Sequence, residues 1–189
     1  DKGFPNKRIE DWKFSDLNQI ISSNIKNLSF YDDKTYKPRE QISLIDKFEH
    51  NKIIFINGAI SKVDIKHEDD TKVLINNDLD LSNNTNEINP LVSLNHALAS
   101  THIGIIVKEN YSLNKPLILY NTTTENVNSA ALNLRTDIKL EKNSSLKLVT
   151  IFDDHSENNF INNALKMQSV LQKGLVYWLL PENPIQLKN

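Results

Sequence analysis

The feature that most constrains the fold is the alternation of apolar and polar residues in the stretch 132–152. The apolar residues of its first half share one side of an extended chain: Leu132, Leu134, Ile138 and Leu140. The residues between them are polar: Asn133, Arg135, Asp137, Lys139 and Glu141. A period of two is typical of a β-strand with one buried face. Turn-type residues follow at 142–145, and alternation resumes at Leu146. The stretch therefore predicts two strands joined by a tight turn.

Similar short segments flank this stretch and are separated by polar or turn-type clusters. Many short strands at near-regular spacing predict a sandwich, a barrel or a β-helix, and the period does not choose among them. The predicted strands are Ile103–Val107, Pro116–Tyr120, Ala131–Glu141, Ser145–Phe152, Phe160–Leu171 and Leu175–Leu180.

The first hundred residues have a different, mixed pattern. Asn57-Gly58 is a strong turn signal for a hairpin over Lys52–Ile65, and a further strand is expected at Val73–Ile75. Helical spacing predicts a helix at Asp16–Lys26, with Ser15 as its N-cap and Trp12 and Phe14 folded onto it, a short helix at Pro38–Phe48, and a helix from Asn89-Pro90 to Ser100. We therefore divide the chain into a mixed helical region with a hairpin, residues 1–100, and a strand-rich region, residues 101–189.

Charge and composition exclude several classes of function. The 189 residues include 22 Lys and Arg and 24 Asp and Glu, a net charge of −2, so no broad basic surface is available for nucleic acid. There is no cysteine, which rules out disulfides and thiolate chemistry within this sequence. No apolar run approaches the length of a membrane span.

No motif predicts a catalytic, cofactor-binding or metal-binding residue. The five histidines show no metal-ligand spacing, and neither a phosphate-binding glycine loop nor a nucleophile elbow is present. His67–Asp70 and Asp153–His155 are expected to be solvated turns, and His96 an exposed helix residue. For Arg135 and Asp137, two residues apart, we expect an outward-facing ion pair.

Two stretches resemble SufD, a member of the SufB/SufD family of iron–sulfur cluster assembly proteins. The first, Phe4–Leu17, contains Glu10-Asp11-Trp12-Lys13-Phe14-Ser15-Asp16-Leu17, which is similar to the family's N-terminal signature. The second is Leu94-Asn95-His96-Ala97-Leu98, followed by Ile106-Val107 and Leu113-Asn114-Lys115-Pro116-Leu117. Thr101-His102 stands where the family usually has Asp-Gly, and Asn110 where it has Gly.

The resemblance implies a mainly β fold. A small helical N-terminal region would be followed, over residues 101–189, by the first coils of a right-handed parallel β-helix. Family members are about twice as long as this chain, so the sequence corresponds to an N-terminal half and the β-helix is expected to be truncated.

The function that the resemblance implies is that of a non-catalytic scaffold subunit in the cytoplasm, paired with a SufB-like paralogue and a SufC-like ATPase. The parent complex would handle the iron–sulfur cluster, and this segment would bind no cofactor directly. The family's interface and cluster-assembly residues belong to the other half, so none is assigned here. The alternatives are a β-helix enzyme acting on polysaccharide and a stand-alone binding module.

Overall fold

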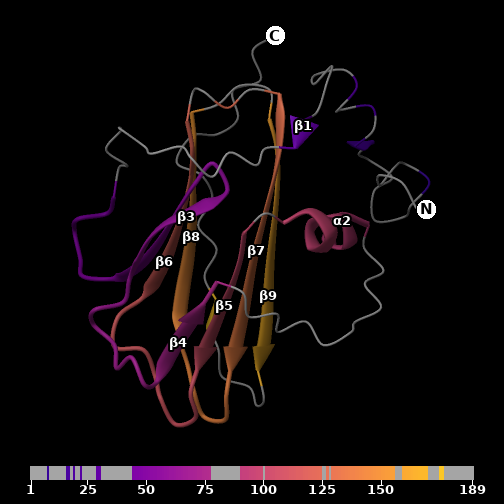
Figure 1. Cartoon of the computed structure of the whole chain (residues 1–189). Coiled ribbons are helices and arrows are strands. Elements are labelled where there is room, and N and C mark those ends of the chain that lie inside the picture. Colours follow the sequence, from indigo (N-terminus) through magenta and orange to yellow (C-terminus); the bar gives the residue numbers. More distant parts are fainter. Residues whose placement is uncertain are drawn as a thin grey trace.

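The computed structural model describes residues 8, 16–17, 19, 22, 29–30, 44–77, 90–99, 101–124, 127, 129–155, 159–169 and 175–176. Within them the chain is mostly β-strand (Figure 1). The strands are β1 (Ser29–Phe30), β2 (Asn51–Ile56), β3 (Ala59–Asp64), β4 (Val73–Asn76), β5 (Thr101–Val107), β6 (Leu117–Thr123), β7 (Ala130–Leu140), β8 (Lys147–Asp154), β9 (Phe160–Ser169) and β10 (Leu175–Val176). Helix α2 spans Pro90–Leu98. The six strands expected after residue 100 are therefore confirmed, the last of them over two residues.

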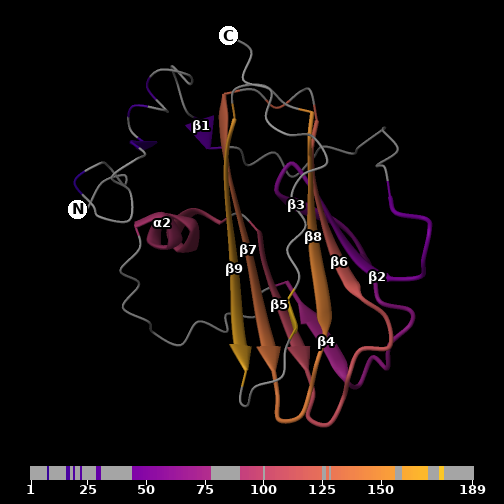
Figure 2. The same ribbon diagram turned by 180° about the vertical axis from the view of Figure 1, so that it is seen from behind.

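The strands form two mixed sheets. Sheet A has the order β1-β7-β5-β4, and β9 pairs with β7 in addition to this order. Sheet B has the order β10-β8-β6-β2-β3. From β5 to β10 the chain alternates between the sheets, and each strand pairs in parallel with the strand two places later. The long strands run side by side in one direction (Figures 1 and 2).

Strands β7 and β8, predicted as neighbours across a tight turn, lie in different sheets and do not pair with each other. The turn is present, and Asn143 within it has a φ of 56°. Asn110, in the turn after β5, has a φ of 58°. The Asn143 amide donates a hydrogen bond to Asn110 Oδ1 at 3.0 Å, so two equivalent turns stack on each other.

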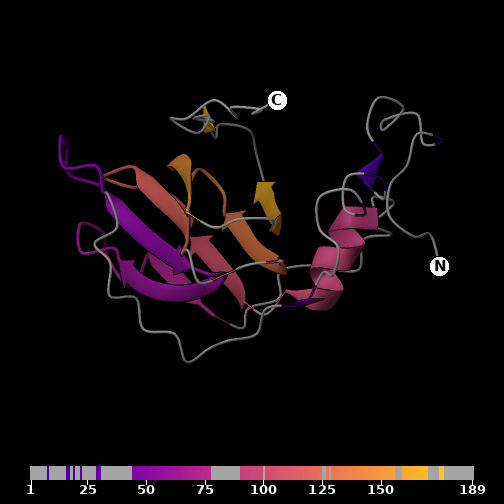
Figure 3. The ribbon, with the colours of Figure 1, turned by 90° about the horizontal axis from the view of Figure 1, so that it is seen from above.

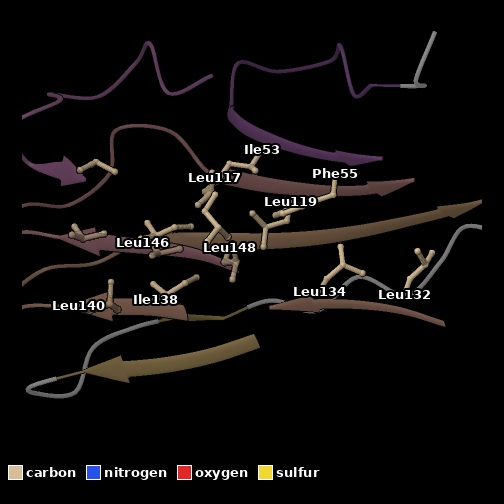
Figure 4. Packing of buried hydrophobic residues seen from close by; sticks show 14 of the residues in the cluster. Ile53, Phe55, Leu117, Leu119, Leu132, Leu134, Ile138, Leu140, Leu146 and Leu148 are labelled. Atoms are coloured by element: carbon tan, nitrogen blue, oxygen red, sulfur yellow. The ribbon is translucent and has the colours of Figure 1, made fainter. Parts of the chain in front are cut away.

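The hydrophobic core lies between the two sheets (Figure 4). Sheet A contributes side chains such as Leu132, Leu134, Ile138 and Leu140, and sheet B contributes Ile53, Phe55, Leu117, Leu119 and Leu148. The alternation therefore identified the inward face of β7 correctly. However, the opposite face is also buried, because ten of the eleven residues of β7 are buried. The expected solvent-facing side of this strand was wrong.

Both sheets end in an antiparallel strand at the same end of the molecule. The hairpin of β2 and β3 is confirmed, with Asn57 at φ 51° and Gly58 at φ 83°, the left-handed conformations that its two-residue turn requires. In sheet A, β4 pairs antiparallel with β5. Because β2 also pairs with β6, residues 51–76 share both sheets with the strands after residue 100.

The predicted helix at 89–100 is confirmed as α2, which packs against β7 and β9 (Figure 3). Of the helix predicted at 16–26, the structure describes four residues: Leu17, Gln19 and Ser22 are helical, and Asp16 precedes them. Asp16 Oδ1 accepts a hydrogen bond from Gln19 N, so Asp16 caps this helix in place of Ser15. Residues 44–48 are not helical, contrary to the helix expected at 38–48, and Trp12 and Phe14 lie outside the described residues.

In the ranges described above, no helix combines the length and the apolar character that crossing a membrane requires.

Candidate functional site

Four charged or titratable residues share the outer face of sheet A, on three neighbouring strands. His102 on β5 is in register with Arg135 on β7, and Asp137 on β7 is in register with Lys166 on β9. Gly104 lies opposite Asp137 on β5 and contributes no side chain. We refer to His102, Arg135, Asp137 and Lys166 as the outer-face cluster.

Asp137 is the centre of this cluster. Its Oδ2 accepts hydrogen bonds from His102 Nε2 at 2.9 Å and from Arg135 Nε at 3.3 Å. Because a carboxylate only accepts, the His102 proton resides on Nε2. The exposed fractions of the side chains are 20% for His102, 4% for Arg135 and 1% for Asp137. The predicted Arg135–Asp137 ion pair therefore exists on the outer face of sheet A, but it is buried and not exposed to solvent.

A cavity of about 520 Å³ adjoins the cluster. Its lining takes residues from both faces of β9, the last described strand on that side of sheet A, together with Val92 of α2 and residues of β6, β7 and β8. Arg135, Asp137 and Lys166 supply its charges. Apolar side chains supply much of the remainder: Leu119, Phe152, Leu165 and Met167.

Two asparagines fasten α2 beside this site. The buried Asn95 donates from Nδ2 to Leu134 O and Asn162 O, both at 2.7 Å. In return, Asn162 Nδ2 donates to Leu91 O of the helix at 2.9 Å. A side chain of the helix therefore donates to backbone carbonyls of the sheet, and a side chain of the sheet donates to a backbone carbonyl of the helix. Asn95, part of the Leu-Asn-x-Ala motif, has a structural role that helical spacing did not reveal.

The turn at 67–70 is not simply solvated, because Glu68 joins three segments. Its Oε1 accepts from Asn51 Nδ2 at 2.6 Å and from Lys115 N at 3.1 Å. Its Oε2 accepts from Tyr111 Oη at 2.8 Å and from Asn114 N at 3.0 Å. Burial acts to raise the pKa of Glu68, but the hydrogen bonds outweigh it and hold the pKa below its ordinary value of 4.5.

Replacing Glu68 with Gln is expected to lower the free energy of unfolding by about 2 kcal/mol at pH 7, because the neutral amide accepts fewer and weaker hydrogen bonds. A pKa lowered by folding stabilises the protein fully above the unfolded-state pKa, and this contribution is lost as pH falls through the folded-state pKa. Urea unfolding at pH 7 and at pH 3 should show the difference between Glu68→Gln and wild type shrinking with acid. Glu109→Gln, at an exposed loop position, is the control, and an equal loss in both variants would contradict the assignment.

The other histidine clusters form weaker arrangements. His155 Nε2 lies 3.1 Å from Asp153 Oδ2, with both side chains substantially exposed. Asp153 and Asp154 end strand β8 and do not lie in a turn, and His96 is exposed on α2 as expected. In the described part of the chain, no three His, Asp or Glu side chains are grouped as a metal ion would require.

Chemically, the outer-face cluster is a His–Asp pair with two nearby cations. Within the described residues, the hydrogen-bond partner of the His102 ring is Asp137, and no hydroxyl group is bound to that ring. The arrangement therefore lacks the nucleophile–base contact that covalent hydrolysis needs. What it offers is fixed positive charge beside an apolar-walled cavity.

A scan against protein-family models found no matching family, and a search of curated proteins found no significant match.

Proposed function

We propose that this chain is a SufD-like, non-catalytic scaffold segment of an iron–sulfur cluster assembly complex, which pairs with a SufB-like paralogue and a SufC-like ATPase. The proposal rests on the resemblance at Phe4–Leu17 and Leu94–Leu98. The observation that supports it best is the order of strands β5 to β10, which alternate between two sheets and pair in parallel with the strand two places later.

On this proposal, β5 to β10 are the first coils of a right-handed parallel β-helix. Parallel strands linked by crossovers within a sheet adopt right-handed connections almost without exception. The stacked turns support the same fold, because Asn110 and Asn143 occupy equivalent positions on successive coils and are joined by a side-chain hydrogen bond. Ser112 and Ser145 form a parallel bridge just after these turns.

The buried Asn95 also supports the resemblance. A motif residue that bonds backbone carbonyls of both β7 and β9 gives a physical reason for asparagine at that position of a Leu-Asn-x-Ala helix. The helix is then the element that covers part of the outer face of the first coils.

One observation favours the second candidate, a β-helix enzyme acting on polysaccharide. Such an enzyme needs acidic and basic side chains on one lateral face of successive coils, and the outer-face cluster has this placement over three strands. Burial weighs against it, since Asp137 and Arg135 are 1% and 4% exposed and a polysaccharide chain needs an open groove. We therefore rank the scaffold first.

The test is capture from native cell extract with an antibody against residues 1–29, followed by intact mass measurement of every bound protein. The scaffold proposal predicts that SufB-like and SufC-like subunits are captured together with the polypeptide that contains this sequence. Capture in the presence of excess competing peptide is the control and should recover none of them. Recovery of the polypeptide without either subunit, in an extract where SufB and SufC capture each other, would refute the proposal.

A further inference from the structure

The outer-face cluster contains more positive charge than the described protein groups neutralise. Lys166 Nζ is buried and has no hydrogen-bond partner in the part of the chain that the structure describes. Arg135 makes one side-chain hydrogen bond within the described residues, from Nε to Asp137, so its terminal nitrogens have no acceptor among those residues. Among the described residues that line the cavity, Asp137 is the one carboxylate, and it is already bonded to His102 and Arg135.

Lys166 does not neutralise this carboxylate further. The two residues are in register on neighbouring strands, yet they form no ion pair, and Asp137 Oδ1 also has no partner. A buried cation without a counter-charge is costly, since it loses hydration and gains no Coulombic attraction in return. Two cations that face one cavity therefore favour an anion within it.

The volume of the cavity and its mixture of apolar and charged lining residues are typical of a small-molecule binding site. Its volume of about 520 Å³ lies within the range of ligand pockets. Leu119 and Phe152 of sheet B give it an apolar part together with Leu165 and Met167, which flank Lys166 in β9 and lie on the opposite, inward face of that strand. An occupant that satisfies both parts has an anionic head and an apolar body.

We propose that this cavity binds a small organic anion, with a carboxylate or phosphate head bound by Arg135 and Lys166 on the outer face of sheet A and an apolar body that passes the edge of β9 and contacts Leu165 and Met167 on its inner face. The guanidinium of Arg135 offers paired donors to oxygen atoms of either head, and Lys166 adds a point charge. The inference is independent of the proposed scaffold function.

The experiment is isothermal titration of the purified full chain with four probes: octanoate, octyl phosphate, octanol and acetate. Octanoate and octyl phosphate should each bind saturably, and the tighter of the two identifies the head group. Octanol, which lacks the charge, and acetate, which lacks the apolar body, should each bind at least about tenfold more weakly than octanoate, as expected when a charged hydrogen bond or the apolar contact is lost.

The key variant is Lys166→Met, which removes a buried charge and keeps an unbranched side chain that is one atom shorter. It should weaken octanoate binding by about tenfold or more and leave octanol binding unchanged. Without ligand its thermal midpoint should equal or exceed that of wild type, since an unpaired buried charge has been removed. The matched control is Lys139→Met. Lys139 lies on β7, on the outer face of sheet A like Lys166, but it is not among the described residues that line the cavity, so this variant should bind octanoate as wild type does.

Three results would overturn the proposal: no saturable binding of either anion, octanol binding as tight as octanoate, or equal octanoate binding by Lys166→Met and Lys139→Met. A lower thermal midpoint for Lys166→Met with unchanged octanoate affinity would show that Lys166 serves to pair with Asp137, and would also refute the anion site.

Discussion

Asn95→Asp is expected to destabilise the folded chain by about 3 kcal/mol or more. The amide of Asn95 donates to two backbone carbonyls in a fully buried position, and a carboxylate cannot donate to either. The variant would place a buried negative charge against two carbonyl oxygens and leave both carbonyls without their donor. Urea unfolding followed by circular dichroism at pH 7 measures the loss.

The matched control is Ala97→Asp, which introduces the same side chain at an exposed position of the same helix. Its effect should be about 0.5 kcal/mol, as for most surface substitutions. Similar losses in the two variants would show that α2 is not fastened to the sheet through Asn95.

Asp137→Ala is expected to lower the free energy of unfolding by about 3–5 kcal/mol. Its removal leaves Arg135, 4% exposed, with no carboxylate partner among the described residues and takes away the acceptor of His102. The loss comes mostly from the uncompensated charge and less from the pair itself. The double variant Arg135→Met with Asp137→Ala should therefore be clearly more stable than Asp137→Ala.

A double-mutant cycle with Arg135→Met, Asp137→Ala and the double variant, measured by thermal unfolding, decides this point. Losses that simply add would mean that the two side chains act independently, despite the 3.3 Å between Arg135 Nε and Asp137 Oδ2. Asp70→Ala, in an exposed turn, controls for the general effect of removing an acidic residue.

Local patterns in the sequence predicted the elements well. Alternation located β7 and β8, because side-chain direction in a strand is a local property, and the polar or turn-type clusters between short strand-like segments located β5, β6 and β9. Asn57-Gly58 located its hairpin because two residues determine that turn. Which strands pair with each other was harder to predict from the sequence. Paired residues are roughly 30 positions apart in this chain, and a local pattern does not identify the partner strand.

The outer-face cluster shows why the site was missed. Asn133, Arg135 and Asp137 lie on the strand face opposite Leu132, Leu134 and Ile138, so the pattern predicted a solvated face. A strand with neighbours on both sides and a helix packed against its sheet buries its polar face as well. The signal that was available is the spacing of His102, Arg135 and Lys166, which matches the sequence separation between paired strands of sheet A. This spacing can be interpreted only once the strand pairing is known.

The two antiparallel strands at one end of the sheets favour one order in which the later strands can join each sheet. Strands β3 and β4 cover the edges of β2 and β5, so later parallel strands can add only at the opposite edges. Each new strand pairs with one that was synthesised about 30 residues earlier, which is the order in which a ribosome releases them. Folding during translation can therefore proceed one strand at a time, with each strand already in a sheet serving as the template for the strand two places later.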